Sequence, residues 1–387
     1  MAEKVMMYAV GDVSPGRDRG EMLLAHTAPV LKKADITFCQ LEQPFSPKVL
    51  FRTGGSGNFD DQDKDNNTSP DADELIGSSK DVAALVNAGF NVCSTAGNRC
   101  FRMGEEGFLD TLDLLKQNGI QVIGTGRNIA EARRPAILER HGTKVAFLGY
   151  NAVLAPDSEA GVDKPGCVPI HISTTYEKVD WQPATPPRIK SWADKDDLAA
   201  MIDDIKKVRG RADVVVFSIH WGVHLIPAVI AEYEYEVGHA AIDAGADLIL
   251  GHHPHILKGI EVYKGKVIFH SMGNWAFESW INPPLPIGKQ IYSKYLGLKT
   301  KVDPEYPFYF FTPECRKSLL VKVVISDKKI KQVSFQPAMI NKQAQPELLP
   351  RSDKRSDEVY EYMKWVCKDQ EMNTTFTRQG DDVVIVT

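Results

Sequence analysis

Short runs of apolar residues alternate with amphipathic helical patterns along most of this sequence. Eight runs rich in β-branched side chains are predicted to be buried strands, over residues 5–10, 36–41, 90–94, 122–124, 145–150, 214–219, 248–250 and 267–270. Helices are predicted between them over residues 81–88, 105–118, 196–208 and 231–244. Because strands that alternate with helices usually pair in parallel, the pattern predicts an α/β protein with a mainly parallel sheet and helices on its faces.

The C-terminal part follows a different pattern. Residues 318–325 and 330–335 alternate apolar and polar side chains on either side of a polar turn, which predicts a β-hairpin. Residues 358–367 predict a further helix. We place the main domain at residues 1–340 and expect residues 341–387 to be an extension packed on the same domain.

Composition excludes several classes of protein. The 387 residues carry a net charge of −5, which gives no sign of the basic patch that nucleic acid or an anionic membrane requires. No stretch approaches the ~20 apolar residues of a membrane span, and the N-terminus lacks the features of a signal peptide. We expect a cytoplasmic protein without nucleic-acid or membrane partners, and a homo-oligomer is compatible with the sequence. The six cysteines form no C-x-x-C pair, so no disulfide scaffold is expected.

Two segments, residues 45–70 and 282–307, are predicted to be long loops. The first contains Asp61, Asp63 and Asp65 at alternate positions, as a calcium-binding loop does. However, it lacks the glycine and the final glutamate of that loop. A solvated acidic loop is the simpler interpretation.

Side chains that commonly bind metals stand at or just after the ends of five predicted strands. Because the carboxyl ends of parallel strands meet at one edge of a sheet, these residues are expected to converge in space. Carboxylate, amide and imidazole groups suit divalent ions, and two ions with a bridging carboxylate can lower the pKa of a bound water. The candidate ligands are Asp12, Glu42, Asn98, His220, His253 and His255.

Each of these candidates has a second interpretation when it is taken alone. Asp12, which follows Gly11, also fits a helix cap or a turn. Glu42 also fits an exposed loop acid, and Asn98 fits a left-handed turn residue. His220 ends an apolar strand and also fits a hydrogen-bonded histidine of the core.

The most informative segment is Gly-His-His-Pro-His at residues 251–255, which directly follows an apolar strand. Three histidines in four residues at such a place indicate metal ligands. His253 and His255 are two residues apart, so both can point into one site if the backbone stays extended there. We expect His252 to be a further ligand or a group beside the ligands, and assign it to catalysis.

The chain resembles the CapA family, named for a poly-γ-glutamate capsule protein and similar to a branch of the calcineurin-like metallophosphoesterases. The matching segments lie in the same order and run from Gly11 to Asn274. They are GDVSPGR, LEQPFS, GFNVCSTAGN, GEEGFLDTLDLL, IGTGRN, HWG and GADLILGHHPHILKGIEVYKGKVIFHSMGN. The resemblance implies a four-layer α/β/β/α sandwich of the metallophosphoesterase type.

The resemblance also implies two divalent metal ions, with manganese, zinc and iron all compatible with the ligands. Glu42 would bridge the two ions. Asp12 and His255 would complete one set of ligands, and Asn98, His220 and His253 would complete the other.

Two positions depart from the family. Arg99 stands where the family usually has histidine, and arginine cannot act as an acid near neutral pH. Its guanidinium can instead bind a carboxylate or phosphate through two hydrogen bonds, so we hypothesise that it binds an anionic group of the substrate. A structural salt bridge is the alternative. His224, where many relatives carry glutamate, either extends the polar pocket or lies on the surface.

Three further residues are candidates for contacts with a negatively charged substrate. Asn151 ends a predicted strand, and Arg17 and Arg19 follow the first candidate ligand.

Together these features predict a hydrolase in which metal-bound hydroxide attacks an amide, lactone, ester or phosphoester of a small anionic substrate. The fold does not choose the bond. A metal-dependent lyase, decarboxylase or demethylase is a second hypothesis, motivated by Arg99. A non-catalytic member of a capsule-assembly system is a third.

Overall fold

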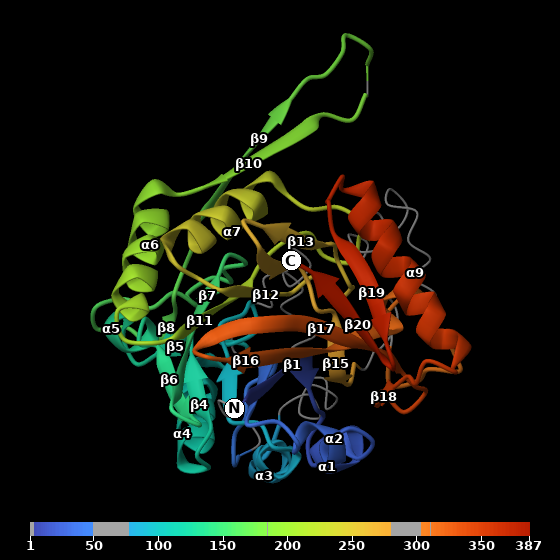
Figure 1. Cartoon of the computed structure of the whole chain (residues 1–387). Helices are drawn as coiled ribbons and strands as arrows, with labels where there is room; N and C mark the ends of the chain where they lie inside the picture. The colour runs from blue at the N-terminus through green and yellow to red at the C-terminus, as the bar shows by residue number, and fades with distance from the viewer. Residues whose placement is uncertain (1–3, 49–76, 184, 280–302, 310) are drawn as a thin grey trace.

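A computed structural model describes residues 4–48, 77–183, 185–279, 303–309 and 311–387, and these form four layers (Figure 1). Two β-sheets pack face to face, and helices cover the outer face of each. This confirms the predicted α/β/β/α sandwich. The prediction of one mainly parallel sheet is wrong in one respect, because the strands are divided between two sheets. Alternation along the chain shows which segments are strands but does not show which sheet each strand joins.

The first sheet has the strand order β19-β20-β17-β16-β1-β2-β3-β4. β1 to β4 run parallel, whereas β16 lies antiparallel on the other side of β1 and forms the predicted hairpin with β17. β15 pairs in parallel with the end of β1. The bounds are β1 Val5–Ser14, β2 Ile36–Leu41, β3 Val92–Ser94, β4 Gln121–Ile123, β15 Asn274–Phe277, β16 Lys317–Ser326 and β17 Lys329–Ile340.

The second sheet has the order β13-β14-β12-β11-β7-β6. Its four inner strands are parallel, and the strands at both edges are antiparallel to their neighbours. The bounds are β6 Ala136–Arg140, β7 Thr143–Asn151, β11 Val214–His220, β12 Leu248–His252, β13 Ile260–Tyr263 and β14 Lys266–Phe269.

Alternate residues of β11 fill two different cores. Val214 and Val216 belong to the core between the two sheets, where the rings of Phe38 and Phe147 stack with centroids 5.9 Å apart. Phe217 and its neighbours at every second position pack against α6 and α7 on the outer face. A strand buried on both faces needs a continuous apolar run, which explains why these strands could be predicted from the sequence.

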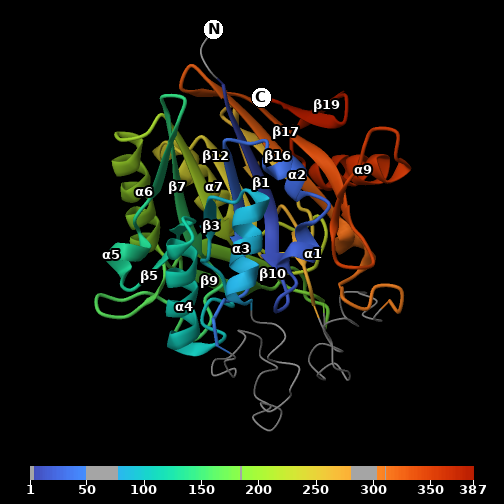
Figure 2. The ribbon, with the colours of Figure 1, turned by 90° about the horizontal axis from the view of Figure 1, so that it is seen from below.

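The helices form the outer layers. α6 and α7 cover the second sheet, and α1, α2, α3 and α4 lie over the first (Figures 1 and 2). The bounds are α1 Gly20–Leu24, α2 Ala28–Leu31, α3 Ser79–Ala88, α4 Gly104–Gln117, α5 Ile129–Ala132, α6 Lys195–Arg209, α7 Glu232–Ala244 and α9 Lys354–Asp369.

The C-terminal residues continue the first sheet. β18 (Pro346–Leu348) and β20 (Asp382–Val386) both pair with β17, and β19 (Thr375–Gln379) pairs with β20. The apolar face of α9 enters the same core through Val359 and Met363.

A two-stranded arm projects from the body above α7 (Figure 1). It consists of β9 (Ile172–Glu177) and β10 (Arg188–Ala193), which pair antiparallel. The sequence analysis did not predict it, because its polar residues follow no clear apolar alternation. β5 (Thr125–Gly126) and β8 (Gly166–Cys167) form a second small pair.

Three other expectations from the sequence concern membrane spans, disulfides and the acidic loop. The first two can be compared with the described residues. None of their helices is long and apolar enough to cross a membrane. All six cysteines are buried thiols, in agreement with the expected lack of a disulfide scaffold. The acidic run with Asp61, Asp63 and Asp65 lies outside the described residues.

Candidate metal centre

The candidate ligands come from both sheets and meet where the parallel strands end. Asp12 lies near the end of β1, at an irregularity in its pairing with β2, and Glu42 directly follows β2. His220 is the last residue of β11, and the turn after β12 carries His253 and His255.

Asp12, Glu42 and His255 form a compact buried group. Each offers one potential ligand atom, and these atoms all lie within 4.8 Å of one another. Nδ1 of His255 is 3.1 Å from Oδ2 of Asp12, and Nε2 of the same ring is 3.6 Å from Oε1 of Glu42. Atoms that bind one ion at ~2.1 Å lie roughly 3–3.5 Å apart, so the spacing suits a divalent cation.

A second group approaches the same carboxylate. Nε2 of His220 is 3.0 Å from Oδ1 of Asn98 and 3.7 Å from Oε1 of Glu42. The rings of His220 and His253 have centroids 4.8 Å apart. Both groups therefore approach Oε1 of Glu42.

Several buried polar atoms of these residues have no hydrogen-bond partner within the described part of the chain. A buried polar atom without a partner costs free energy, and in native proteins such atoms are rare. Carboxylate oxygens and ring nitrogens are atom types that a bound cation can satisfy. These atoms are Oδ1 of Asp12, both carboxylate oxygens of Glu42, Nδ1 of His220 and Nδ1 of His253.

The protonation states also suit a cation. Burial lowers the pKa of His253 to about 3 and holds that of His220 well below its usual range, so both rings are neutral ligands at neutral pH. Burial opposes ionisation of Asp12, but hydrogen bonds and Coulombic attraction from His252 and His255 keep its pKa below the ordinary value. Burial raises the pKa of Glu42, and this effect outweighs the opposing charges of His255 and Arg99.

The backbone around the histidines is bent, so the expectation of an extended segment is wrong. His253 has φ of 97° and His255 has φ of 54°, both in the left-handed region that side chains rarely adopt. Such conformations cost of order 1–3 kcal/mol each and are concentrated at functional sites. The bend still brings both rings to the site.

Comparison with known proteins shows which family has these features. The profile of the family described as bacterial capsule synthesis protein PGA_cap matches residues 6–279. The chain belongs to this family.

Two curated relatives are similar over most of the matched region. The capsule biosynthesis protein CapA of Bacillus anthracis is 28% identical over 285 residues, which cover 71% of this chain and 60% of that protein. The PGA biosynthesis protein CapA of Bacillus subtilis (strain 168) is 29% identical over 285 residues, 70% of this chain and 62% of that protein. The chain thus spans about 60% of the length of these relatives.

Among solved structures, a hypothetical protein from Thermus thermophilus covers 86% of this chain and 98% of its own. Its sequence identity is 11% and its TM-score is 0.44.

In this PGA_cap protein, one residue that the sequence analysis missed orients a candidate ligand. Asn274 begins β15, pairs with Asp12 and accepts a 2.8 Å hydrogen bond from Nδ1 of His255. Its amide nitrogen donates to the hydroxyl of Tyr309 at 2.7 Å. A partner of this kind fixes the ring of a metal-binding histidine. The available signal was the position of Asn274, which follows Gly273 five residues after the apolar strand β14 ends.

Arg99 lies at the site, in the turn that follows Asn98. Its charge acts on both Glu42 and His253, and its guanidinium carbon is 5.8 Å from the centre of the Phe277 ring. Within the described residues it makes no ion pair of its own, so the salt-bridge alternative has no support there.

Two further histidines border the candidate ligands. The ring of His224 stacks on His253 with centroids 5.2 Å apart and meets the edge of His255 at the same distance. His224 therefore lies beside the candidate ligands. His252 is fully buried, with Nδ1 3.3 Å from Oδ1 of Asp12.

The remaining candidates have local structural partners. The amide of Asn151 bonds to both backbone groups of Val153, at 2.9 and 3.2 Å. Arg17 donates to backbone carbonyls of residues 46–48, each at 3.4 Å. Arg19 pairs with Glu278. These contacts shape the loops around the centre and do not direct the three side chains into it.

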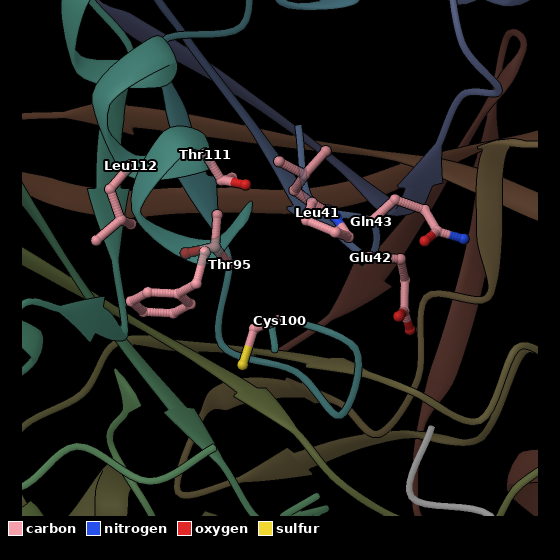
Figure 3. Close-up of a pocket in the computed structure, with 9 residues that line it drawn as sticks. Leu41, Glu42, Gln43, Thr95, Cys100, Thr111 and Leu112 are labelled. Atoms are coloured by element: carbon pink, nitrogen blue, oxygen red, sulfur yellow. The ribbon is translucent and has the colours of Figure 1, made fainter. Parts of the chain in front are cut away.

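A small recess lies next to Glu42, between the ends of β2 and β3 and helix α4 (Figure 3). Its lining includes Thr95, Cys100 and Leu112, and it has room for about one water molecule. Figure 3 shows the carboxylate of Glu42 pointing away from the apolar part of the recess. The histidines lie outside this lining, so the recess borders the candidate metal centre.

Proposed function

We propose that this protein is a metal-dependent hydrolase with a dinuclear centre, acting on a small anionic substrate. The observation that supports it best is the buried group of Asp12, Glu42 and His255, in which Oδ1 of Asp12 and both carboxylate oxygens of Glu42 lack hydrogen-bond partners among the described residues. The second group, around His220, shares Glu42 with the first. Divalent ions held there would lower the pKa of a bound water and polarise the bond to be cleaved.

The protein's own residues have separate roles in this proposal. Arg99 binds an anionic group of the substrate, because its guanidinium is next to the ligands and has no ion pair within the described residues. His224 supplies the proton for the leaving group, since its ring lies against both His253 and His255. It would take over the task that arginine at position 99 cannot perform. His252 holds Asp12 in place from its buried side.

The proposed substrate class rests on the positive charge of Arg99 and on the names of the relatives. Their names assign CapA of B. anthracis to capsule biosynthesis and CapA of B. subtilis to PGA biosynthesis. An anionic amide, lactone, ester or phosphoester therefore fits both the family and Arg99. A metal-dependent lyase, decarboxylase or demethylase would use the same ligands, and it differs in taking no oxygen from water.

Metal content is the first test. We expect close to two Mn²⁺ or Zn²⁺ ions per chain by elemental mass spectrometry, a clear loss in His253→Ala, and no loss in the control His171→Ala, which changes a half-exposed histidine. The loaded protein is then assayed on 4-nitrophenyl phosphate, bis(4-nitrophenyl) phosphate, 4-nitrophenyl acetate and γ-glutamyl-4-nitroanilide in ¹⁸O-labelled water. A product without the label would contradict hydrolysis and favour the lyase-type reaction.

A non-catalytic role in capsule assembly is the second candidate. It is favoured by the relatives' names, which describe biosynthesis. Two results would support this role against the hydrolase: the purified protein binds no metal, and His253→Ala leaves the melting temperature unchanged.

A further inference from the structure

A buried lysine lies just beyond the candidate ligands. Lys258 is 1% exposed and follows His255 by three residues. Its ammonium group donates hydrogen bonds to the carbonyl of Ile226 and, at 2.7 Å, to the carbonyl of Val229. A buried ammonium is costly unless it is well bonded, so these contacts keep this side chain in a defined place.

Both carbonyls belong to the segment between β11 and α7, residues 221–231, which carries His224. Within the described part of the chain this segment forms no helix or strand of its own, so side chains must fix its shape. The lysine side chain is long and its ammonium group has three N–H donors. It can therefore donate hydrogen bonds to two carbonyls that lie three residues apart.

The same segment is held at other points. The backbone N–H of Leu225 donates to the carbonyl of Pro254 at 2.9 Å, which ties it directly to the turn of His253 and His255. At its far end, Ala231 donates to the carboxylate of buried Glu234 at 2.7 Å. The charge of Glu234 also acts on Lys258, so two buried groups of opposite charge support the segment.

This arrangement connects the ligand turn to His224. Lys258 belongs to the chain segment of His253 and His255, and it holds the segment that brings the ring of His224 against their rings. We propose that Lys258 is a positioning residue that places His224 over the candidate metal centre. The inference rests on the proposed function only in the chemical task given to His224.

The test observes the ring of His224 itself. Ring ¹⁵N NMR spectra of the full chain with labelled histidines are recorded in EDTA and again with Zn²⁺, and His224→Gln assigns the signals of His224. In Lys258→Met we expect these signals to shift towards values of a solvent-exposed histidine and to broaden. Signals of the distant His26, His141 and His171 should not change.

Two variants separate positioning from a general structural effect. Lys258→Arg restores a cationic donor and should return the His224 signals towards their wild-type positions. Lys322→Met removes another partly buried lysine, which bonds to Gln336 and Asp382 far from the centre, and should leave His224 unchanged. If Lys258→Met does not fold, Lys258→Gln, which keeps one amide donor, is measured by the same criteria.

Wild-type His224 signals in Lys258→Met, or an equal shift in Lys322→Met, would overturn the proposal. The spectra in EDTA test positioning alone. Failure to bind Zn²⁺ would count against the hydrolase and would leave the comparison in EDTA valid. For any probe that the enzyme hydrolyses, Lys258→Met should reduce kcat about tenfold or more and have little further effect in the His224→Gln background.

Discussion

Nε2 of His220 lies 3.0 Å from Oδ1 of Asn98, and this contact joins the two sheets of the sandwich. His220 ends β11 of the second sheet, whereas Asn98 follows β3 of the first. The ring's other nitrogen is buried without a hydrogen-bond partner among the described residues. An imidazole and an amide oxygen held this close, next to Glu42, have the spacing of two ligands of one ion.

Glu42→Gln should have opposite effects on stability and on metal binding. The carboxylate is buried, and burial raises its pKa, so in metal-free protein keeping this group ionised costs free energy. We expect the variant to be more stable than wild type in EDTA, by about 1–3 kcal/mol, and to bind much less Mn²⁺. Thermal unfolding with EDTA and with Mn²⁺ measures both effects. The control is Glu358→Gln, an exposed position on α9; a Glu42→Gln protein that binds metal like wild type would refute the bridging role.

Asn274→Ala should weaken metal binding without removing a ligand. The asparagine accepts a hydrogen bond from Nδ1 of His255, and loss of such a partner typically costs 10–100-fold in metal affinity. Asn274→Asp keeps an acceptor and should retain most of the affinity. Competition with a fluorescent Zn²⁺ chelator measures the dissociation constants. Asn118→Ala, at the exposed end of α4, serves as the control; equal affinities for Asn274→Ala and wild type would argue against an orienting role.

Stability of the metal-free protein should fall as the pH drops from about 6.5 towards about 3. The folded protein keeps His253 neutral down to a pKa of about 3, whereas in the unfolded chain it takes up a proton near pH 6.5. The unfolded state thus binds more protons in this window, and the free energy of unfolding decreases by up to ~1.4 kcal/mol per pH unit for this histidine. His220 acts in the same direction.

Urea unfolding in EDTA between pH 4 and 8 checks this slope. We expect a shallower slope in His253→Asn. His171 provides the opposite case, because its pKa in the folded protein is raised. Burial alone would lower this pKa, but the contacts with Asp197 and Glu159 together have the larger effect. His171→Gln should therefore not flatten the slope. An unchanged slope in His253→Asn would contradict a buried neutral ring.

Arg99 should determine affinity for anions more than it determines metal content. With inorganic phosphate as the probe and Zn²⁺ bound, we expect Arg99→Met to weaken binding about 10–100-fold, in line with loss of hydrogen bonds to a charged group. Arg99→His should also weaken it, while metal content stays at the wild-type level. Isothermal titration measures the affinities. Unchanged phosphate affinity in Arg99→His would exclude the anion-binding role.

The buried strands were predictable because strands covered on both faces must be apolar throughout, as β11 illustrates. The ends of those strands also indicated where Asp12, Glu42 and His220 would meet. The contribution of Asn274 could not be predicted in the same way, because it depends on β15 pairing with β1 across about 260 residues of sequence. The bent backbone at His253 and His255 was also missed, since a positive φ is uncommon even for histidine, although histidine adopts it more often than most residues. The β9–β10 arm lacks both an apolar alternation and a glycine turn.

The position of β1 has a consequence for synthesis of the chain. β1 leaves the ribosome before its antiparallel neighbour β16, which begins at Lys317, some 300 residues later. Domains form from the N-terminal side as the chain is made, so one edge of β1 lacks this partner until those residues have been added. An unpaired strand edge invites association with other chains. The nascent protein is therefore exposed to aggregation until β16 has been made, and a chaperone that shields this edge would act during that interval.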